Sequence, residues 1–99
     1  KSAVDSLTRI AALEMAPRDI RVNAVCPSFI ATDMGGSEYG DAMATTLTPL
    51  GRLGKLQDLV GVYHFLAADE SAYISGQALN VDGGWSAGIS EQLSAQFRT

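Results

Sequence analysis

The sequence has few of the residues that build metal centres and disulfide frameworks. Its 99 residues contain one cysteine, Cys26, and one histidine, His64. A single cysteine excludes an internal disulfide and is typical of a reducing compartment, so we expect a cytoplasmic protein. One cysteine and one histidine are too few for a zinc cluster, and we expect no metal ligands. The longest apolar runs fall far short of the roughly 18 residues of a membrane span, so we expect no membrane partner.

Basic residues are also scarce. Seven Lys and Arg residues stand against eleven Asp and Glu, which gives a formal net charge of −4. The basic residues are scattered and form no stripe, so a nucleic-acid partner is not expected. The composition, 46% hydrophobic and 18% charged, is that of a globular protein. A chain of this length forms one domain at most and has a thin core.

Three segments have helical character. Residues 2–16 repeat apolar side chains at helical spacing up to Pro17, and residues 55–68 do so more regularly. A shorter helix is expected between Glu38 and Leu47, inside a glycine-rich segment whose length is typical of lids and binding loops. The first helix carries an apolar arc that fits either a buried core or a subunit interface, made of Ala3, Val4, Leu7, Ile10, Ala11 and Met15.

Two short runs predict strands. Residues 20–26, "IRVNAVC", are β-branched and apolar on both faces apart from Arg21 and Asn23, which favours a parallel strand that Pro27 ends. Residues 77–82, "QALNVD", predict a second strand. A helical crossover between them makes the two strands parallel.

The predicted order is helix, strand, short helix, helix, strand, followed by a weakly amphipathic or loose tail over 86–99. Two parallel strands do not form a stable sheet alone, and no strand precedes the first helix. The sequence therefore predicts an α/β fold, the C-terminal portion of a larger doubly wound parallel sheet.

Three stretches occur together in a specific order: "KSAVDSLTR" from Lys1, "IRVNAVCPSFIATDM" from Ile20, and "GRLGKLQDLVGVYHFLAADESAYISGQALNVDGGW" from Gly51. They resemble the C-terminal part of a short-chain dehydrogenase/reductase, in particular one like the 3-oxoacyl-carrier-protein reductases. The resemblance implies that residues 1–99 are the C-terminal portion of one NAD(P)-binding Rossmann-type domain. The dinucleotide-binding half, a catalytic serine and a catalytic tyrosine would then lie upstream.

The resemblance implies a catalytic role for Lys1. Lys1 matches the lysine of the family's Tyr-x-x-x-Lys pair, which also binds the nicotinamide ribose. Residues four apart share a helix face, and an ammonium near a phenol lowers the phenol pKa from its usual value of about 10. The tyrosine can then exchange a proton with the substrate oxygen. Without the neighbouring motifs, Lys1 would be a solvated residue at a helix start.

The loop after the first strand is expected to contact the cofactor. In an open α/β sheet, ligands bind beyond the carboxyl ends of the strands. The segment from Pro27 to Thr32 resembles the family's "PGxxxT" loop, which implies backbone contacts to the nicotinamide carboxamide from Ile30 and a hydroxyl contact from Thr32. Thr32 could instead cap the following helix. Ser28 replaces the usual glycine, and we expect its φ to be negative.

The resemblance places Met34, Tyr39 and Met43 in the segment that covers the substrate, and Trp85 beside the substrate pocket or at a subunit contact. It implies an oxidoreductase that transfers hydride between NAD or NADP and a small carbonyl or secondary alcohol, homo-oligomeric (tetramer or dimer) at full length. The 99 residues alone are expected to be inactive. Two alternatives are a non-catalytic relative used for binding or oligomerisation and an independent small α/β module.

Overall fold

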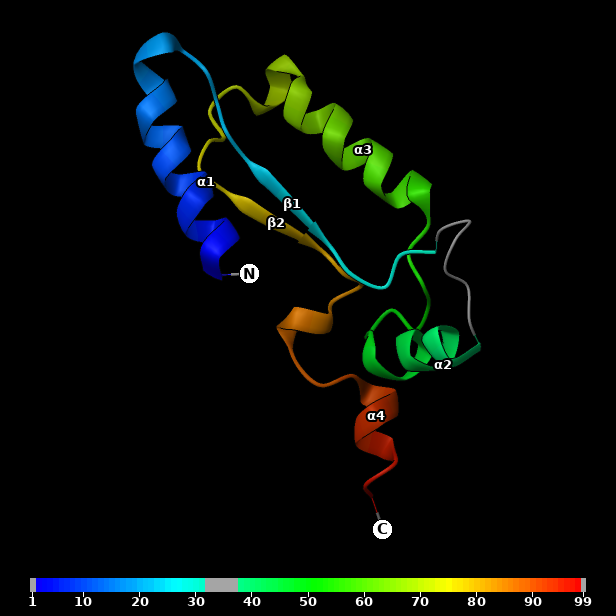
Figure 1. The fold of residues 1–99 in the computed structure, drawn as a ribbon. Helices are drawn as coiled ribbons and strands as arrows, with labels where there is room; N and C mark the ends of the chain where they lie inside the picture. The colour runs from blue at the N-terminus through cyan, green and yellow to red at the C-terminus, as the bar shows by residue number, and fades with distance from the viewer. Residues whose placement is uncertain (1, 32–37, 99) are drawn as a thin grey trace. The chain divides into compact units, whose positions relative to one another are not determined.

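The computed structural model describes residues 2–31 and 38–98, and only the backbone of Ser2, Glu38 and Tyr39. The predicted order of helices and strands is confirmed, and α2 has the predicted bounds. The elements are α1 (Ser2–Met15), β1 (Ala24–Pro27), α2 (Glu38–Leu47), α3 (Leu56–Ala67), β2 (Ala78–Val81) and α4 (Glu91–Ala95), with 3-10 turns at Ala16–Arg18, Asp69–Ser71 and Trp85–Ala87 (Figure 1).

The chain forms two compact units. The first consists of Lys1–Cys26 with Val60–Leu79, and the second of Pro27–Leu59 with Asn80–Thr99. Both strands and α3 cross from one unit to the other, so neither unit is a continuous segment of sequence.

The two strands pair in parallel. The Ala24 N–H donates to the Gln77 carbonyl at 2.8 Å, and the Ser28 N–H donates to the Val81 carbonyl at 3.2 Å, so pairing advances in the same direction along both segments. The predicted start of the first strand, residue 20, is wrong, because β1 begins at Ala24.

Side chains take the place of ladder hydrogen bonds before β1. The Val22 N–H donates to the Ser75 hydroxyl at 3.2 Å. The Asn23 amide donates to the Ile74 carbonyl at 3.0 Å and accepts from the Gln77 N–H at 3.0 Å. These bonds satisfy the backbone locally and delay the regular ladder by several residues.

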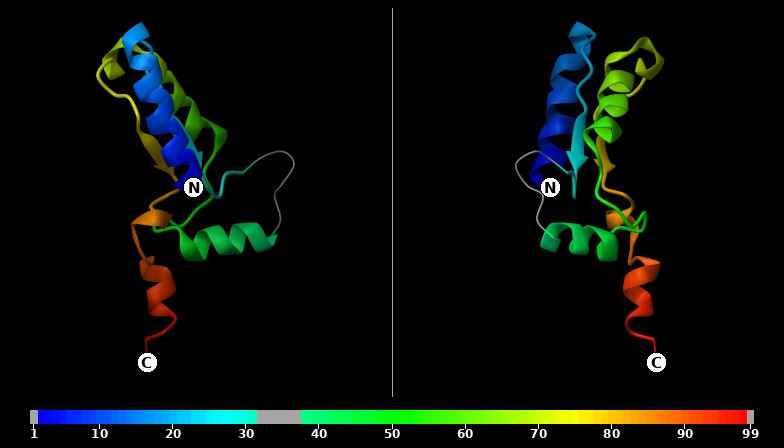
Figure 2. Two further views of the ribbon diagram at one scale, coloured as in Figure 1. Left: turned by 60° about the vertical axis from the view of Figure 1, so that its left-hand side comes forward. Right: turned by 90° about the vertical axis from the view of Figure 1, so that its right-hand side faces the viewer.

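In the first unit, α1 and the part of α3 beyond Leu59 lie on opposite sides of the two strands (Figure 2). The apolar arc expected on α1 is largely exposed among the described residues. Thr8 and Ala12 are buried, whereas Leu7 is 68% exposed. Small side chains allow the close approach, since a Cβ at Gly76 would lie 3.5 Å from the Ala12 Cβ. The Thr8 hydroxyl is satisfied inside the helix by the Val4 carbonyl at 2.7 Å.

In the second unit, the expected tail is partly ordered as α4. Ser90 caps this helix by accepting from the Leu93 N–H at 3.1 Å, and its own hydroxyl donates to the Thr46 carbonyl of α2. The Gln92 amide donates to the Thr48 carbonyl at 2.6 Å. These side-chain bonds tie α4 to α2. Within residues 2–31 and 38–98, no helix combines the length and apolar character needed to cross a membrane.

Candidate functional site

A cleft of about 220 Å³ opens in the second unit where both strands end. The loop after β1 supplies Ser28 and Ile30 to it, and the end of β2 supplies Val81. This is the expected place for a ligand in a parallel α/β sheet. Pro27 is exposed at the end of β1 and does not line the cleft. The lining consists of Ser28, Ile30, Thr48, Leu50, Arg52, Gly54, Asp58, Val81, Asp82 and Gly83.

The loop after β1 turns at Phe29 and not at Ser28. Among the described non-glycine residues, positive φ occurs at Asp19 and at Phe29, where φ is 56°. The prediction that Ser28 has negative φ is therefore confirmed, which explains why serine is compatible with this position. A bulky residue in the left-handed region is uncommon and costs about 1–2 kcal/mol. The sequence pattern gave no sign that Phe29 would carry this conformation.

Ile30 lies in a parallel bridge with Gly54. The Gly54 N–H donates to the Phe29 carbonyl at 2.8 Å, and the Ala31 N–H donates to the Gly54 carbonyl at 2.8 Å. A trans peptide points its N–H opposite to its C=O, so the N–H and C=O of Ile30 both point away from Gly54. Neither group has a hydrogen-bond partner within the described residues. Ile30 thus offers a donor and an acceptor side by side, the complement of an amide.

Gly54 is a residue whose role the sequence did not reveal. A Cβ at this position would come within 2.5 Å of the Ile30 Cδ1. The end of the Ile30 side chain therefore packs directly over Gly54, and a larger residue at position 54 would require that side chain to move.

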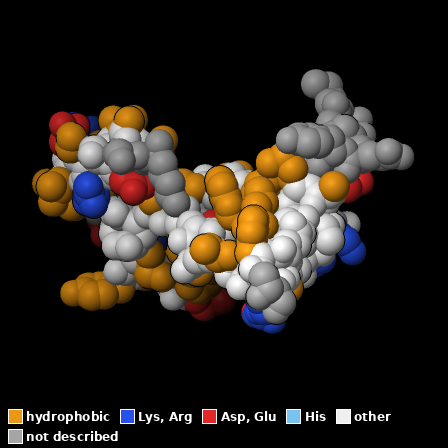
Figure 3. All heavy atoms as spheres, turned by 90° about the horizontal axis from the view of Figure 1, so that it is seen from below, with side chains coloured by type: hydrophobic (Ala, Val, Ile, Leu, Met, Phe, Trp, Pro, Cys, Tyr) orange, Lys and Arg blue, Asp and Glu red, His pale blue; other side chains and the backbone are white. Residues whose placement is uncertain are grey.

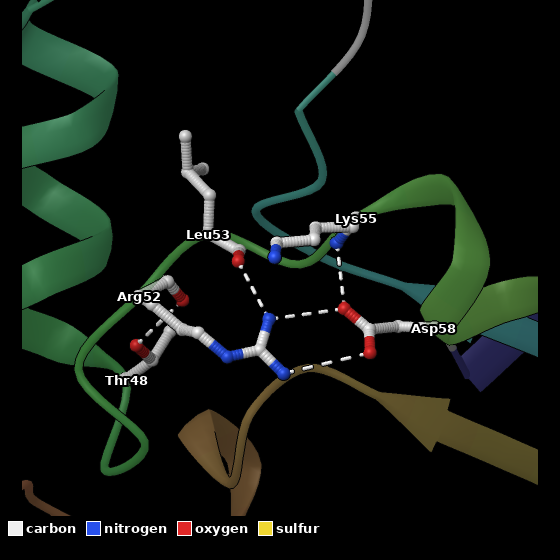
Figure 4. A network of polar contacts seen from close by, with 5 residues as sticks. All are labelled: Thr48, Arg52, Leu53, Lys55 and Asp58. Carbon is white, nitrogen blue, oxygen red and sulfur yellow. Dashed lines mark hydrogen bonds and ion pairs between the residues drawn. The ribbon is translucent and has the colours of Figure 1, made fainter.

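A polar network holds the segment that contains Gly54 (Figure 4). Arg52 donates from Nη1 to Asp58 Oδ2 at 3.0 Å and to the Leu53 carbonyl at 2.9 Å. Asp58 also accepts from the Lys55 N–H at 2.7 Å, as a carboxylate in the first helical turn commonly does. The hydrogen bond from Arg52, followed by that from Lys55, holds the pKa of Asp58 below its usual value, and Asp58 raises the pKa of Arg52. The network fixes the entry into α3.

The other predicted site residues either are not described or belong to α2. Lys1, Thr32 and Met34 lie outside the described residues. Tyr39 and Met43 are both in α2, where Met43 is half-buried and does not line the cleft. The described part of the chain contains no group of three or more His, Cys, Asp or Glu side chains placed to hold a metal ion.

The profile of the family described as enoyl-(acyl carrier protein) reductase matches residues 1–86. The solved structure of a short-chain type dehydrogenase/reductase from Mycobacterium ulcerans superposes with a TM-score of 0.80 at 34% identity, over 97% of this chain. The chain belongs to the short-chain dehydrogenase/reductase family. The predicted α/β, Rossmann-type fold class is thereby confirmed.

Two further relatives show what share of a longer protein these residues match. The 3-oxoacyl-acyl-carrier-protein reductase of Thermotoga maritima is 46% identical over 86 residues, which cover 85% of this chain and 35% of that protein. A blue fluorescent protein from a metagenomic library, solved in complex with NADPH, superposes with a TM-score of 0.78 at 34% identity and is covered to 35%. The chain spans about a third of the length of these relatives.

Proposed function

We propose that residues 1–99 are the C-terminal portion of one NAD(P)-binding domain in an oxidoreductase that transfers hydride between a nicotinamide and a small carbonyl or secondary alcohol. The observation that carries the proposal is that the N–H and C=O of Ile30, just after β1, have no hydrogen-bond partner among residues 2–31 and 38–98. The NADPH complex of the metagenomic relative and the reductase name of the Thermotoga relative support it.

The described residues fit a nicotinamide at this position. Its carboxamide carries one carbonyl acceptor and one NH₂ donor, which match the N–H and C=O of Ile30. Pro27 and Ser28 end the strand and lead the chain to that contact, and the Thr32 hydroxyl would bond the carboxamide or a phosphate. When bound, NAD or NADP supplies or accepts the hydride.

Lys1 would support proton transfer by the catalytic tyrosine. One helical turn after a tyrosine, its ammonium would favour the phenolate and lower the pKa of that tyrosine toward working pH. The tyrosine would then move a proton to or from the substrate oxygen. Lys1 would also bind the ribose hydroxyls of the cofactor. Met34, Tyr39 and Met43 would cover the substrate in this arrangement.

A second candidate function is a non-catalytic module for binding or oligomerisation. Hydrophobic side chains lie open in groups on the surface shown in Figure 3. On α1 they form a stripe at Val4, Leu7, Ile10 and Leu13, each at least 45% exposed. Such a stripe fits a helix that packs against another chain or segment. We propose a cytoplasmic homo-oligomer, a dimer or tetramer, for the enzyme as well, so the stripe alone does not separate the two functions.

An assay of hydride transfer distinguishes the enzyme from the non-catalytic module. The complete protein that contains residues 1–99 should bind NADH or NADPH and consume it with a panel of ketones, as followed by nicotinamide absorbance. Lys1→Ala should lower kcat by about 100-fold or more, the usual contribution of proton-transfer machinery. Lys55→Ala is the matched control, because that lysine is exposed and, among the described residues, its hydrogen bonds are made by its backbone.

Two results would contradict the proposal. Failure of the complete protein to bind either cofactor would favour the non-catalytic function. Turnover by the 99 residues alone would show that no upstream tyrosine is needed.

A further inference from the structure

Phe29 and Trp85 form an aromatic pair next to the loop assigned to the nicotinamide. Their ring centroids are 5.2 Å apart with planes at 74°, an edge-to-face contact. Such pairs contribute beyond the area that they bury. Both residues belong to the second unit.

Phe29 needs a stabilising contact because its backbone conformation is unfavourable. Its φ of 56° lies in the left-handed region, which a phenylalanine rarely adopts without support. Its carbonyl accepts from the Gly54 N–H at 2.8 Å, and the same peptide unit carries the N–H of Ile30. The conformation of Phe29 therefore sets the direction of one of the two groups offered to the carboxamide.

Trp85 approaches Phe29 from a well-fixed turn. The buried Asp82 accepts from the Gly84 N–H at 3.1 Å and from the Ser86 N–H at 3.2 Å, and its carbonyl accepts from the Trp85 N–H at 3.1 Å. Gly84 also lies close to Pro49, since a Cβ there would be 3.1 Å from the Pro49 Cγ. The turn after β2 thus fixes the backbone at residue 85 and at the residues before and after it.

We propose that Trp85 is a positioning residue for the cofactor, which acts through Phe29 to hold the Ile30 backbone in its carboxamide-binding orientation. The inference rests on the proposed function. It assigns Trp85 to the nicotinamide and not to the substrate pocket or a subunit contact, the two roles expected from sequence. Trp85 does not itself line the cleft that Ser28 and Ile30 line, so it would act on the cofactor through Phe29.

The test compares two cofactors in the complete protein. One is the natural dinucleotide, and the other is its 3-aminopyridine analogue, in which an amino group replaces the carboxamide so that no carbonyl is left to accept from the Ile30 N–H. Dissociation constants are measured for wild type, Trp85→Ala, Trp85→Leu and Trp85→Phe. Tyr73→Ala is the matched aromatic control, because Tyr73 is fully exposed.

Trp85→Ala and Trp85→Leu should raise the dissociation constant of the natural cofactor by about 5- to 10-fold, which corresponds to the loss of one hydrogen bond. The dissociation constant of the analogue should not change. Trp85→Phe should restore binding, and Tyr73→Ala should have no effect. The leucine variant keeps apolar volume if the alanine variant does not fold.

The role of Trp85 would be overturned if both cofactors lost affinity equally or if neither did. A raised KM for the carbonyl substrate alone would overturn it as well. Failure of the wild type to bind any dinucleotide would instead overturn the proposed function.

Discussion

Gly54 faces Ile30 so closely that a single methyl group at position 54 would come within 2.5 Å of the Ile30 Cδ1. The contact joins the segment before α3 to the loop after β1 through a parallel bridge. The backbone hydrogen bonds that Gly54 forms with Phe29 and Ala31 hold the two segments together.

Gly54→Ala should destabilise the complete protein by about 1 kcal/mol, because the added methyl group forces the end of the Ile30 side chain out of its rotamer. Gly54 has no positive φ, so the cost is steric and not conformational. Urea unfolding measures it. Ile30→Val deletes Cδ1, and the double variant Gly54→Ala/Ile30→Val should recover most of the loss. If the changes in unfolding free energy of the two single variants simply added in the double variant, the alanine methyl group at position 54 would not contact the Ile30 side chain.

Phe29→Val should be more destabilising than Phe29→Asn by about 1 kcal/mol, although valine is the more apolar residue. Asparagine tolerates the left-handed region, whereas a β-branched side chain is strongly disfavoured there. Both variants lose the Trp85 ring contact, so their difference reports the backbone alone. The midpoint of thermal unfolding is a sufficient measurement. The reverse order would mean that residue 29 does not hold φ near 56° in solution.

Asp58 should make the stability of the entry into α3 sensitive to acid. Its pKa is lowered in the folded protein, first by the hydrogen bond from Arg52 and then by that from the Lys55 N–H. The resulting stabilisation is present above the usual pKa of 3.8 and is lost as the pH falls through the lower folded value.

Asp58→Asn should therefore be less stable than wild type above pH 3.8 and approach wild type below it, as measured by unfolding at a series of pH values. Asp69→Asn makes the same charge change at an exposed aspartate and serves as the control. A constant difference between wild type and Asp58→Asn at every pH would contradict the assignment.

Lys1→Met should move the pH profile of alcohol oxidation in the complete protein to higher pH. Loss of the ammonium would let the pKa of the catalytic tyrosine rise toward its usual value of about 10, so phenolate would form only in more alkaline solution. Lys55→Met should leave the profile in place. A lower kcat with an unmoved profile would limit Lys1 to binding the ribose.

The sequence predicted best where local signals decide the structure. The helix expected between Glu38 and Leu47, within a glycine-rich segment, has the observed bounds of α2, and Pro27 marked the end of β1. It failed where contacts between distant segments decide. The start of β1 depends on the bonds of Asn23 to Ile74 and Gln77, and the packed side of α1 depends on the small Gly76 opposite Ala12.

The same contrast between local signals and distant contacts applies to the candidate site. The resemblance pointed to Ile30, and the structure gives a geometric reason why its backbone is available. No local pattern indicated that Phe29 would be left-handed, because phenylalanine has no preference for that region. The roles of Gly54 and Trp85 come from partners far away in the sequence, which composition and periodicity do not reveal.

The most direct test of the central claim is to read the coding sequence immediately upstream of the Lys1 codon. The account predicts a tyrosine four residues before Lys1, a serine further upstream and a glycine-rich loop earlier still, which together would complete the active site. A phenylalanine at the tyrosine position, or a start codon directly before Lys1, would contradict the catalytic account and favour the binding or oligomerisation module.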